Sequence, residues 1–187
     1  MVIGVLALQG DFAEHAHMLR RLGHTPVEVR LPRDLTGLAG LIIPGGESTT
    51  IGKLAVTYGL MEPLRAFAQD KPVWGTCAGA IFLSRDAHRD QPLLGLMDIT
   101  VRRNAYGRQV DSFEADVDVK GIEHAVRGVF IRAPRVDRVG DGVRVLAVHE
   151  GHPVVLEQGN LLVASFHPEL VGETGLHRYL LGKLGTG

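Results

Sequence analysis

The sequence contains a single cysteine, Cys77, among 187 residues. One cysteine cannot form a disulfide within the chain, and scarcity of cysteine is typical of proteins in a reducing compartment. We therefore expect a cytoplasmic protein. The lone cysteine is either a small apolar residue of the core, as free cysteines usually are, or a reactive thiol.

The chain also lacks an excess of charge and any long hydrophobic run. Its 20 basic and 21 acidic residues give a net charge of −1, with no block of one sign, so we expect neither a nucleic-acid nor an anionic-membrane partner. No apolar run reaches the length of a membrane span. The apolar N-terminal stretch lacks a basic start and a following cleavage site, so we interpret it as a strand and not as a signal peptide.

Buried strands and helices alternate in the first half of the sequence. The predicted strands are 2–8, 26–31, 38–44 and 71–77, and the predicted helices are about 12–22, a region ending near 69, and one from 78. Asp11 and Glu14 have the spacing of a helix-capping box. Strands separated by helices are typical of a doubly wound sheet with parallel strands.

The second half is rich in short strands. They are predicted at 97–104, 111–119, 127–134, 143–150, 152–159 and 160–169, followed by a helix over about 174–184. Several of them pair as hairpins, so we expect an antiparallel extension of the same sheet. The prediction is one α/β domain over 1–187: a mostly parallel, flavodoxin-like central sheet with helices on both faces and antiparallel strands added in the second half.

The stretch "VWGTCAG" at 73–79 has the form of a nucleophile elbow. Cys77 follows an apolar strand and precedes a helix, with Gly75 and Gly79 on either side. A tight strand-to-helix turn needs small neighbours and raises its central side chain above the carboxyl edge of the sheet. The start of the helix favours the thiolate form. The alternative interpretation is an inert, buried cysteine.

A nucleophilic thiol needs a base, and "SFHPEL" at 165–170 offers His167 and Glu169 at the end of another predicted strand. Pro168 disfavours helical angles at His167, so we predict an extended segment in which His167 and Glu169 point to the same side. Glu169 then holds one imidazole nitrogen and leaves the other for Cys77. The alternative is an ordinary histidine beside a solvated glutamate.

The glycine-rich stretch "PGGEST" at 44–49 follows a buried strand. The backbone N–H groups of Gly45 and Gly46, together with that of Ala78, could stabilise the oxyanion of a tetrahedral intermediate. Glu47 or Ser48 could contact a substrate. The alternative is a plain turn, because Pro-Gly-Gly is common turn chemistry.

Two further signals are weaker. The polar stretch at 102–109 is either a basic surface turn or the carrier of an arginine for a substrate carboxylate. His149 and His152 lie three residues apart, but no third ligand is apparent, so we expect no metal site.

Taken together, "GTCAG", "PGGES" and "HPE" resemble the motifs of class I, triad-type glutamine amidotransferases. A closer resemblance, to the glutaminase subunits of pyridoxal 5′-phosphate synthase, covers nearly the whole chain. It rests on "GVLALQGDFAEH", "IPGGESTTIGKL", "GTCAGAIFL", "RNAYGRQVDSFEAD", "FIRAP" and "SFHPEL", which occur in that order. The most specific parts, "PGGESTTI" and "NAYGRQVDSFEAD", are not shared by other amidotransferases. The stretch "VGETG" at 171–175 departs from the family pattern and bears on a partner contact.

The resemblance implies roles for individual residues. Cys77 is implied to be the nucleophile, His167 the base and Glu169 its orienting carboxylate. The residues implied to bind glutamine are Gly46, Glu47, Ser48, Arg103, Ile131 and Arg132.

The resemblance also implies a reaction and a partner. The family hydrolyses L-glutamine to L-glutamate and ammonia through a thioester intermediate and without a cofactor. The ammonia passes to a separate synthase subunit, a (β/α)₈ barrel, in a hetero-oligomeric complex. That partner makes pyridoxal 5′-phosphate (vitamin B6) from ribose 5-phosphate and glyceraldehyde 3-phosphate. The resemblance therefore implies that the chain is the hydrolase subunit of a complex that also has lyase activity.

The residues alone leave two other functions open. The chain could be a cysteine hydrolase of the same architecture that acts on another amide, as a peptidase or a deglycase does. It could also be a non-catalytic, flavodoxin-like binding module with an inert Cys77. Release of glutamate from glutamine, and labelling of Cys77 by a glutamine-like electrophile, distinguish these functions.

Overall fold

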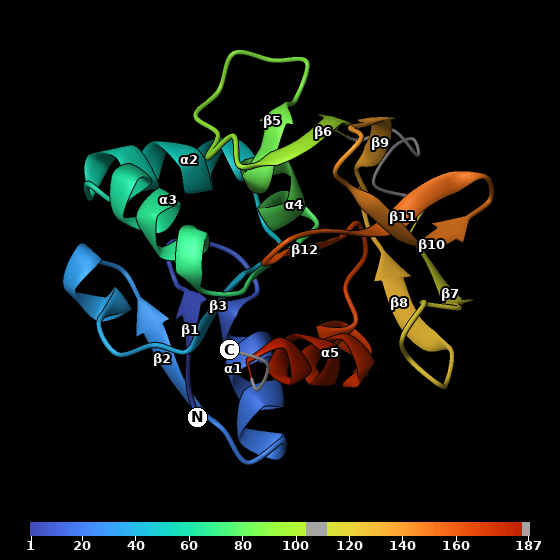
Figure 1. The fold of residues 1–187 in the computed structure, drawn as a ribbon, viewed down its shortest axis with the longest axis horizontal. Helices are drawn as coiled ribbons and strands as arrows, with labels where there is room; N and C mark the ends of the chain where they lie inside the picture. Colours follow the sequence, from blue (N-terminus) through green and yellow to red (C-terminus); the bar gives the residue numbers. More distant parts are fainter. Residues whose placement is uncertain (104–111, 185–187) are drawn as a thin grey trace.

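The centre of the molecule is a seven-stranded sheet, seen in a computed structural model that describes residues 1–103 and 112–184. Its strands are β1 (Val2–Leu6), β2 (Thr25–Val29), β3 (Gly40–Ile43), β4 (Val73–Thr76), β10 (Arg144–His149), β11 (His152–Gln158) and β12 (Leu161–Ala164). Their order is β10-β11-β12-β4-β3-β1-β2 (Figure 1). The five strands from β12 to β2 are parallel, and β11 and β10 continue the sheet as antiparallel strands. The predicted α/β fold is confirmed.

Helices cover both faces of this sheet. They are α1 (Phe12–Arg21), α2 (Ser48–Thr57), α3 (Met61–Asp70), α4 (Ala78–Leu83) and α5 (Gly175–Lys183), with short 3₁₀ turns η1 (Pro32–Leu35) and η2 (Glu169–Val171). Helices α2, α3 and α4 lie on one face and α1 and α5 on the other (Figure 1). Because successive side chains of a strand point to opposite faces, Leu41 and Ile43 pack with the first group and Ile42 with the second.

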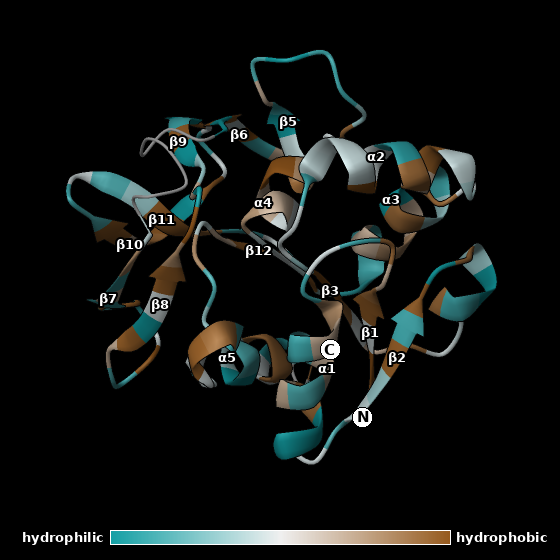
Figure 2. Ribbon diagram, turned by 180° about the vertical axis from the view of Figure 1, so that it is seen from behind, coloured by the Kyte–Doolittle hydropathy of each residue, from teal (hydrophilic) through white to brown (hydrophobic). Residues whose placement is uncertain are grey.

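Hydrophobic residues are concentrated where the strands and helices meet. Figure 2 shows brown segments along the central strands, whereas the outward loop between β5 and β6 is largely teal. Both core clusters include sheet residues with no exposed surface, such as Leu41 and Trp74. None of the helices in the two described ranges combines the length and hydrophobicity that crossing a bilayer requires.

In the second half, the predicted antiparallel extension of the central sheet is present as β11 and β10, but the other strands of this half do not join that sheet. The remaining strands are β5 (Ser84–Asp86), β6 (Met97–Arg102), β7 (Phe113–Val117), β8 (Val126–Phe130) and β9 (Arg135–Val139). They form two separate sheets, β5-β6-β9 and the hairpin β7-β8. The first packs on the α4 side of the central sheet and the second on the α5 side, so each sheet buries a face of its own.

Two local predictions also differ from the structure. The helical region after "PGGES" is two helices, α2 and α3, because Gly59 adopts a left-handed conformation (φ +67°) that ends the first. The capping box at α1 is absent, since the Asp11 side chain makes no capping hydrogen bond within the described residues. That side chain faces His167 instead.

Candidate active site

Cys77 lies between β4 and α4, at the carboxyl edge of the central sheet. Its backbone angles, φ +48° and ψ −103°, belong to a region that L residues rarely adopt. The Cys77 N–H donates to the carbonyl of Ala164 in β12 over 2.8 Å, which ties the turn to the sheet. The predicted strand–turn–helix elbow is therefore present, with the backbone strain that clusters at functional sites.

His167 and Glu169 follow β12 at the same edge of the sheet. Nδ1 of His167 lies 2.7 Å from Oε1 of Glu169, and each residue is 5% exposed. The path of the chain differs from the predicted extended segment. Pro168 has helical angles (φ −73°, ψ −28°), so the chain turns directly into η2. The predicted contact between imidazole and carboxylate forms within this turn.

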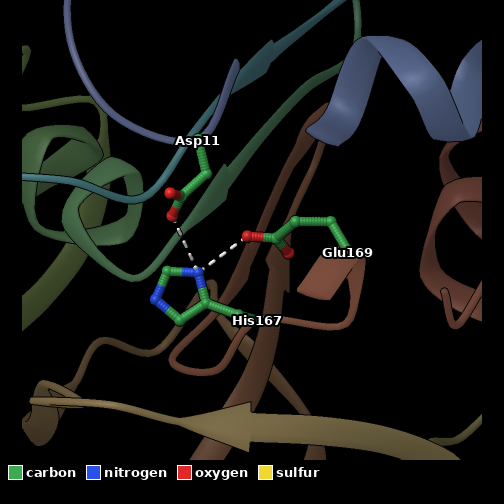
Figure 3. A group of neighbouring side chains, drawn as sticks. All are labelled: Asp11, His167 and Glu169. Atoms are coloured by element: carbon green, nitrogen blue, oxygen red, sulfur yellow. Dashed lines mark hydrogen bonds and ion pairs between the residues drawn. The ribbon is translucent and has the colours of Figure 1, made fainter. Parts of the chain in front are cut away.

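The ring of His167 also interacts with the sulfur of Cys77. Burial disfavours a charged ring, but hydrogen bonds with Cys77 and Glu169 outweigh it and raise the pKa of His167 well above its ordinary value of 6.5. Glu169 occupies Nδ1, which leaves Nε2 for the sulfur, and Figure 3 shows Nε2 on the far side of the ring from the carboxylates. A protonated imidazole beside a sulfur favours reaction of the thiolate.

A second carboxylate, which the sequence analysis missed, faces the same imidazole nitrogen. Oδ2 of Asp11 lies 3.4 Å from Nδ1 of His167 (Figure 3). Burial raises the pKa of Asp11, and the neighbouring His167 opposes that rise. A signal was available, because Asp11 closely follows the first strand and parallel strands end at one edge of a sheet. The spacing of Asp11 and Glu14 favours a helix cap and hides this signal.

A cleft of about 340 Å³ opens beside the sulfur. It is lined by Gln9, Asp11, Gly46, Glu47, Ser48, Cys77, Ala78, Ile81, Arg103, Ile131, Arg132, His167 and Leu170. The structure therefore brings together most of the residues singled out in the sequence, and adds Gln9, Asp11, Ile81 and Leu170. A volume of this size is at the lower end for small-molecule sites.

One wall of the cleft carries a pair of opposite charges. Arg103 donates a short hydrogen bond to Glu47, and Thr49 donates to the same carboxylate oxygen over 3.0 Å. Burial opposes ionisation of Glu47, but the Thr49 hydroxyl and the Arg103 charge hold its pKa below the ordinary value. Gln91, which the sequence analysis missed, accepts from Arg103 (3.4 Å) and donates to Ser48 (3.1 Å). The wall therefore presents a cation and an anion side by side.

The three residues predicted to supply oxyanion N–H groups lie around the side chains of Cys77 and His167. Gly46 and Ala78 line the cleft. Gly45 lies against the base, because a Cβ added there would come within 2.2 Å of Cε1 of His167. The N–H of Glu47 donates to Oε1 of Gln9 over 2.7 Å, which fastens the glycine stretch to the turn that follows β1.

Two further predicted residues, Ile131 and Arg132, also line the cleft. The carbonyl oxygen of Ile131 is 4.0 Å from the sulfur of Cys77, and Arg132 has a positive φ of +47°. Most of the polar stretch predicted at 102–109 lies outside the described residues, of which Arg103 is the last before the gap.

One group of side chains within the described ranges could in principle hold a metal ion: Asp11, His167 and Glu169, whose donor atoms all lie within 4.8 Å of one another. Two ligands of one zinc ion, each about 2 Å from it, lie roughly 3.3 Å apart in a tetrahedral site. The 2.7 Å contact between His167 and Glu169 is shorter and suits a hydrogen bond. His149, considered for a metal in the sequence, packs 5.2 Å from the ring of Phe130.

Two more histidines are buried behind Glu169. His15 of α1 and His177 of α5 have no exposed surface, and Nδ1 of His15 lies 3.0 Å from Nε2 of His177. Burial lowers the pKa of His15 well below its ordinary value, and lowers the pKa of His177 to about 4. Both rings are therefore neutral near pH 7.

The buried pair predicts that the protein loses stability in mild acid. Both rings stay neutral in the folded state, whereas the unfolded chain binds protons near pH 6.5. The contribution of this pair to the free energy of unfolding is therefore greatest above pH 6.5 and falls as the pH drops toward about 4. At about 1.4 kcal/mol per pH unit, His177 accounts for about 3 kcal/mol of this loss.

Urea unfolding at about pH 7.5 and about pH 4.5 measures this effect. The His177→Gln variant is expected to lose less stability on acidification than the wild type. The exposed His17 provides the control, so His17→Gln should lose as much as the wild type. Equal losses in all three proteins contradict the prediction.

Over nearly its whole length, the chain is similar to one family of known enzymes. The profile of the SNO glutamine amidotransferase family matches residues 5–184. The subunit named "Pyridoxal 5'-phosphate synthase subunit PdxT" of Roseiflexus sp. (strain RS-1) is 54% identical over 187 residues, covering 97% of this chain and 99% of the relative. The subunit of the same name from Thermus thermophilus is 54% identical over 189 residues, covering 99% and 98%.

Solved structures show the same fold. A crystal structure described as a glutamine amidotransferase superposes with a TM-score of 0.95 at 50% sequence identity, and each chain is covered completely. A structure of PurLQS from Thermotoga maritima superposes with a TM-score of 0.70 at 18% identity, with 98% of both chains covered. At that identity, the second likeness concerns the fold alone.

Proposed function

Because the chain belongs to the SNO glutamine amidotransferase family, we propose that it is the glutaminase subunit of a pyridoxal 5′-phosphate synthase and hydrolyses L-glutamine to L-glutamate and ammonia. The observation that carries this proposal is the meeting of one thiol, one imidazole and one carboxylate at the mouth of a small cleft. The relatives that share 54% of the sequence over nearly its full length bear the name of that subunit.

In the proposed mechanism the Cys77 thiolate attacks the side-chain amide carbon of glutamine. The new carbon–sulfur bond places a negative charge on the amide oxygen, and the protonated His167 then gives its proton to the departing nitrogen. The carbon–nitrogen bond breaks, ammonia leaves, and a thioester to Cys77 remains. His167 next takes a proton from water, the hydroxide attacks the thioester, and glutamate leaves as the thiolate and the imidazolium return.

Two carboxylates support the charge that His167 carries during this cycle. We assign Glu169 the role of orienting Nδ1, because it is buried and 2.7 Å away. Asp11, 3.4 Å away on the cleft wall, adds negative charge that stabilises the imidazolium. The backbone N–H groups of Gly45, Gly46 and Ala78 are the proposed donors to the oxyanion.

The charged wall of the cleft suits the amino-acid end of glutamine. A free amino acid carries one ammonium and one carboxylate group. We assign the carboxylate to Arg103 and the ammonium to Glu47, which already lie next to each other, with Ser48, Ile131 and Arg132 completing the pocket. Binding then exchanges one ion pair for two and leaves the net charge of the cleft unchanged, because the ligand carries one charge of each sign.

The ammonia would pass to a synthase subunit docked beside the cleft. Leu170 lines the cleft and is 40% exposed, and the adjacent Val171 is 38% exposed, so an apolar surface borders the opening. This surface includes part of the stretch that departs from the family pattern. Direct docking keeps ammonia from being protonated and lost in water. The single unpaired cysteine suits a reducing compartment, and we place the complex in the cytoplasm.

Glutamate release, measured with and without a matching synthase subunit, tests the proposal. A misplaced oxyanion donor costs on the order of 10²–10³ in rate, and two of the three proposed donors, Gly45 and Gly46, lie on a glycine stretch that can reorient. We expect the isolated chain to be a poor glutaminase, and addition of the partner to raise its turnover by about 10-fold or more. No glutamate release in either condition contradicts the activity, and equal turnover contradicts the dependence on a partner.

A further inference from the structure

The ring of His15 lies behind Glu169 and touches both segments that carry the reactive side chains. Its Nε2 is 3.2 Å from Oγ1 of Thr76, the residue directly before Cys77. The same nitrogen is 3.6 Å from Oε1 of Glu169, the oxygen that holds His167. A single buried nitrogen therefore lies between the strand that ends at the nucleophile and the carboxylate that orients the base.

We propose that His15 is a positioning residue that fixes Glu169 relative to the Cys77 elbow, so that His167 meets the sulfur in the reactive geometry. This inference rests on the proposed glutaminase function. His15 touches neither the substrate cleft nor the reacting atoms, so it acts only through Glu169 and Thr76.

The orientation of Glu169 depends on the contact with His15, because only one of the two carboxylate oxygens has a polar partner among the residues that the structure describes. Within the described residues, Oε2 of Glu169 is buried without a hydrogen-bond partner. Oε1 contacts His167 and His15, so these two contacts determine the orientation of the carboxylate. Asp11 approaches the same imidazole nitrogen and, as a like charge, favours displacement of Glu169. The contact of His15 with the same oxygen, Oε1, opposes this displacement.

The position of His15 is itself fixed by its surroundings. Its other nitrogen, Nδ1, is hydrogen-bonded to His177 of α5. The ring of Trp74, fully buried in β4, lies edge-on to both histidines, with centroids 5.4 Å from His15 and 4.8 Å from His177. Burying two polar rings costs more free energy than burying aliphatic side chains, unless the ring nitrogens make hydrogen bonds. Both nitrogens of His15 make such contacts, Nδ1 with His177 and Nε2 with Thr76.

Replacing His15 with asparagine or with glutamine tests the contacts of its two ring nitrogens separately. The amide of asparagine reaches about as far as Nδ1 and can keep the contact with His177. The amide of glutamine reaches about as far as Nε2 and can donate to or accept from Glu169 and Thr76. We expect His15→Asn to lower kcat for glutamate release by about 10–100-fold with little change in KM, since small misplacements of catalytic groups cost about that much. His15→Gln is expected to recover most of the rate.

The assay uses the full chain with saturating synthase subunit, and urea unfolding shows which variants are folded at the assay temperature. Exposed His17 on the same helix provides the matched control, and His17→Asn should behave as the wild type. If His15→Asn does not fold, His15→Phe takes its place, because it keeps a flat ring and removes both nitrogens.

A double substitution tests whether His15 acts through Glu169. In a Glu169→Ala background, His15→Asn should cost almost nothing further, because the group it positions is absent. Equal loss in both backgrounds, an unchanged kcat in folded His15→Asn, or equally low rates for the Asn and Gln variants overturns the inference. A wild type that releases no glutamate overturns the proposed function instead, so the two failures are distinguishable.

Discussion

Replacing Cys77 with alanine is expected to abolish glutamate release, with a loss on the order of 10⁵-fold or more. The size of the effect follows from the proposed mechanism, because no other thiol is present and the thioester cannot form without the sulfur. Glutamine should still bind to Cys77→Ala, since the charged wall formed by Arg103 and Glu47 is unchanged. Steady-state release and calorimetric titration with glutamine measure the two quantities separately.

Ser165→Ala is the matched control for this substitution. Ser165 is buried at the end of β12, and its hydroxyl has no hydrogen-bond partner among the described residues. Removing that oxygen is therefore expected to leave both turnover and stability close to the wild type. A diazoketone analogue of glutamine should label the wild type, and excess glutamine should protect it. Substantial glutamate release by Cys77→Ala, or labelling that persists in it, contradicts the assignment of the nucleophile.

Replacing Gly79 with alanine is expected to destabilise the fold by about 3 kcal/mol or more. A Cβ at this position would lie 2.1 Å from the carbonyl oxygen of Ile43 in β3 and 2.9 Å from its carbon. These are backbone atoms of a central strand, so the clash can be relieved only by moving α4 away from the sheet. Overpacking of this kind typically costs about 1–3 kcal/mol, and more where the neighbours cannot shift.

Gly182→Ala is the control for Gly79→Ala. Gly182 is an exposed residue of α5, and among the described residues no atom outside the adjacent helix backbone lies within 4 Å of the position that its Cβ would take. Alanine favours helix more than glycine does, so this substitution should raise the free energy of unfolding by about 0.5–1 kcal/mol. Urea unfolding measures both variants. Normal stability of Gly79→Ala would show that α4 is not held against β3 as closely as described.

The elbow and its base were predictable from the sequence because each is determined by neighbouring residues. Small residues on both sides of Cys77 are required by the tight turn, and a Cβ at Gly75 would come within 2.5 Å of Gly79. His167 follows a buried strand, and parallel strands end at one edge, so its meeting with Cys77 follows from the topology. The contact with Glu169 was predicted correctly, although by an extended geometry that the turn at Pro168 replaces.

The unpredicted features depend on contacts between distant segments. His15 has a helical spacing that suits a residue facing the sheet, but its partners come from β4 and α5. Strand β9 was missed because its sequence, "RVDRV", is mostly charged, and Arg135 and Asp137 pair on its exposed side. The separation of the second half into three sheets is decided by which face each strand buries, and the pattern of one strand does not contain that information.

The backbone pairing of His167 with Val129 of β8, through hydrogen bonds of 2.8 and 3.1 Å, links the base to a hairpin far from the nucleophile in the chain. The proposed triad is thus complete only when the β7-β8 sheet, β12 and the elbow have all docked. A partly folded or nicked molecule would carry the reactive thiol without its base. Newly made or damaged copies would therefore be unable to consume glutamine futilely.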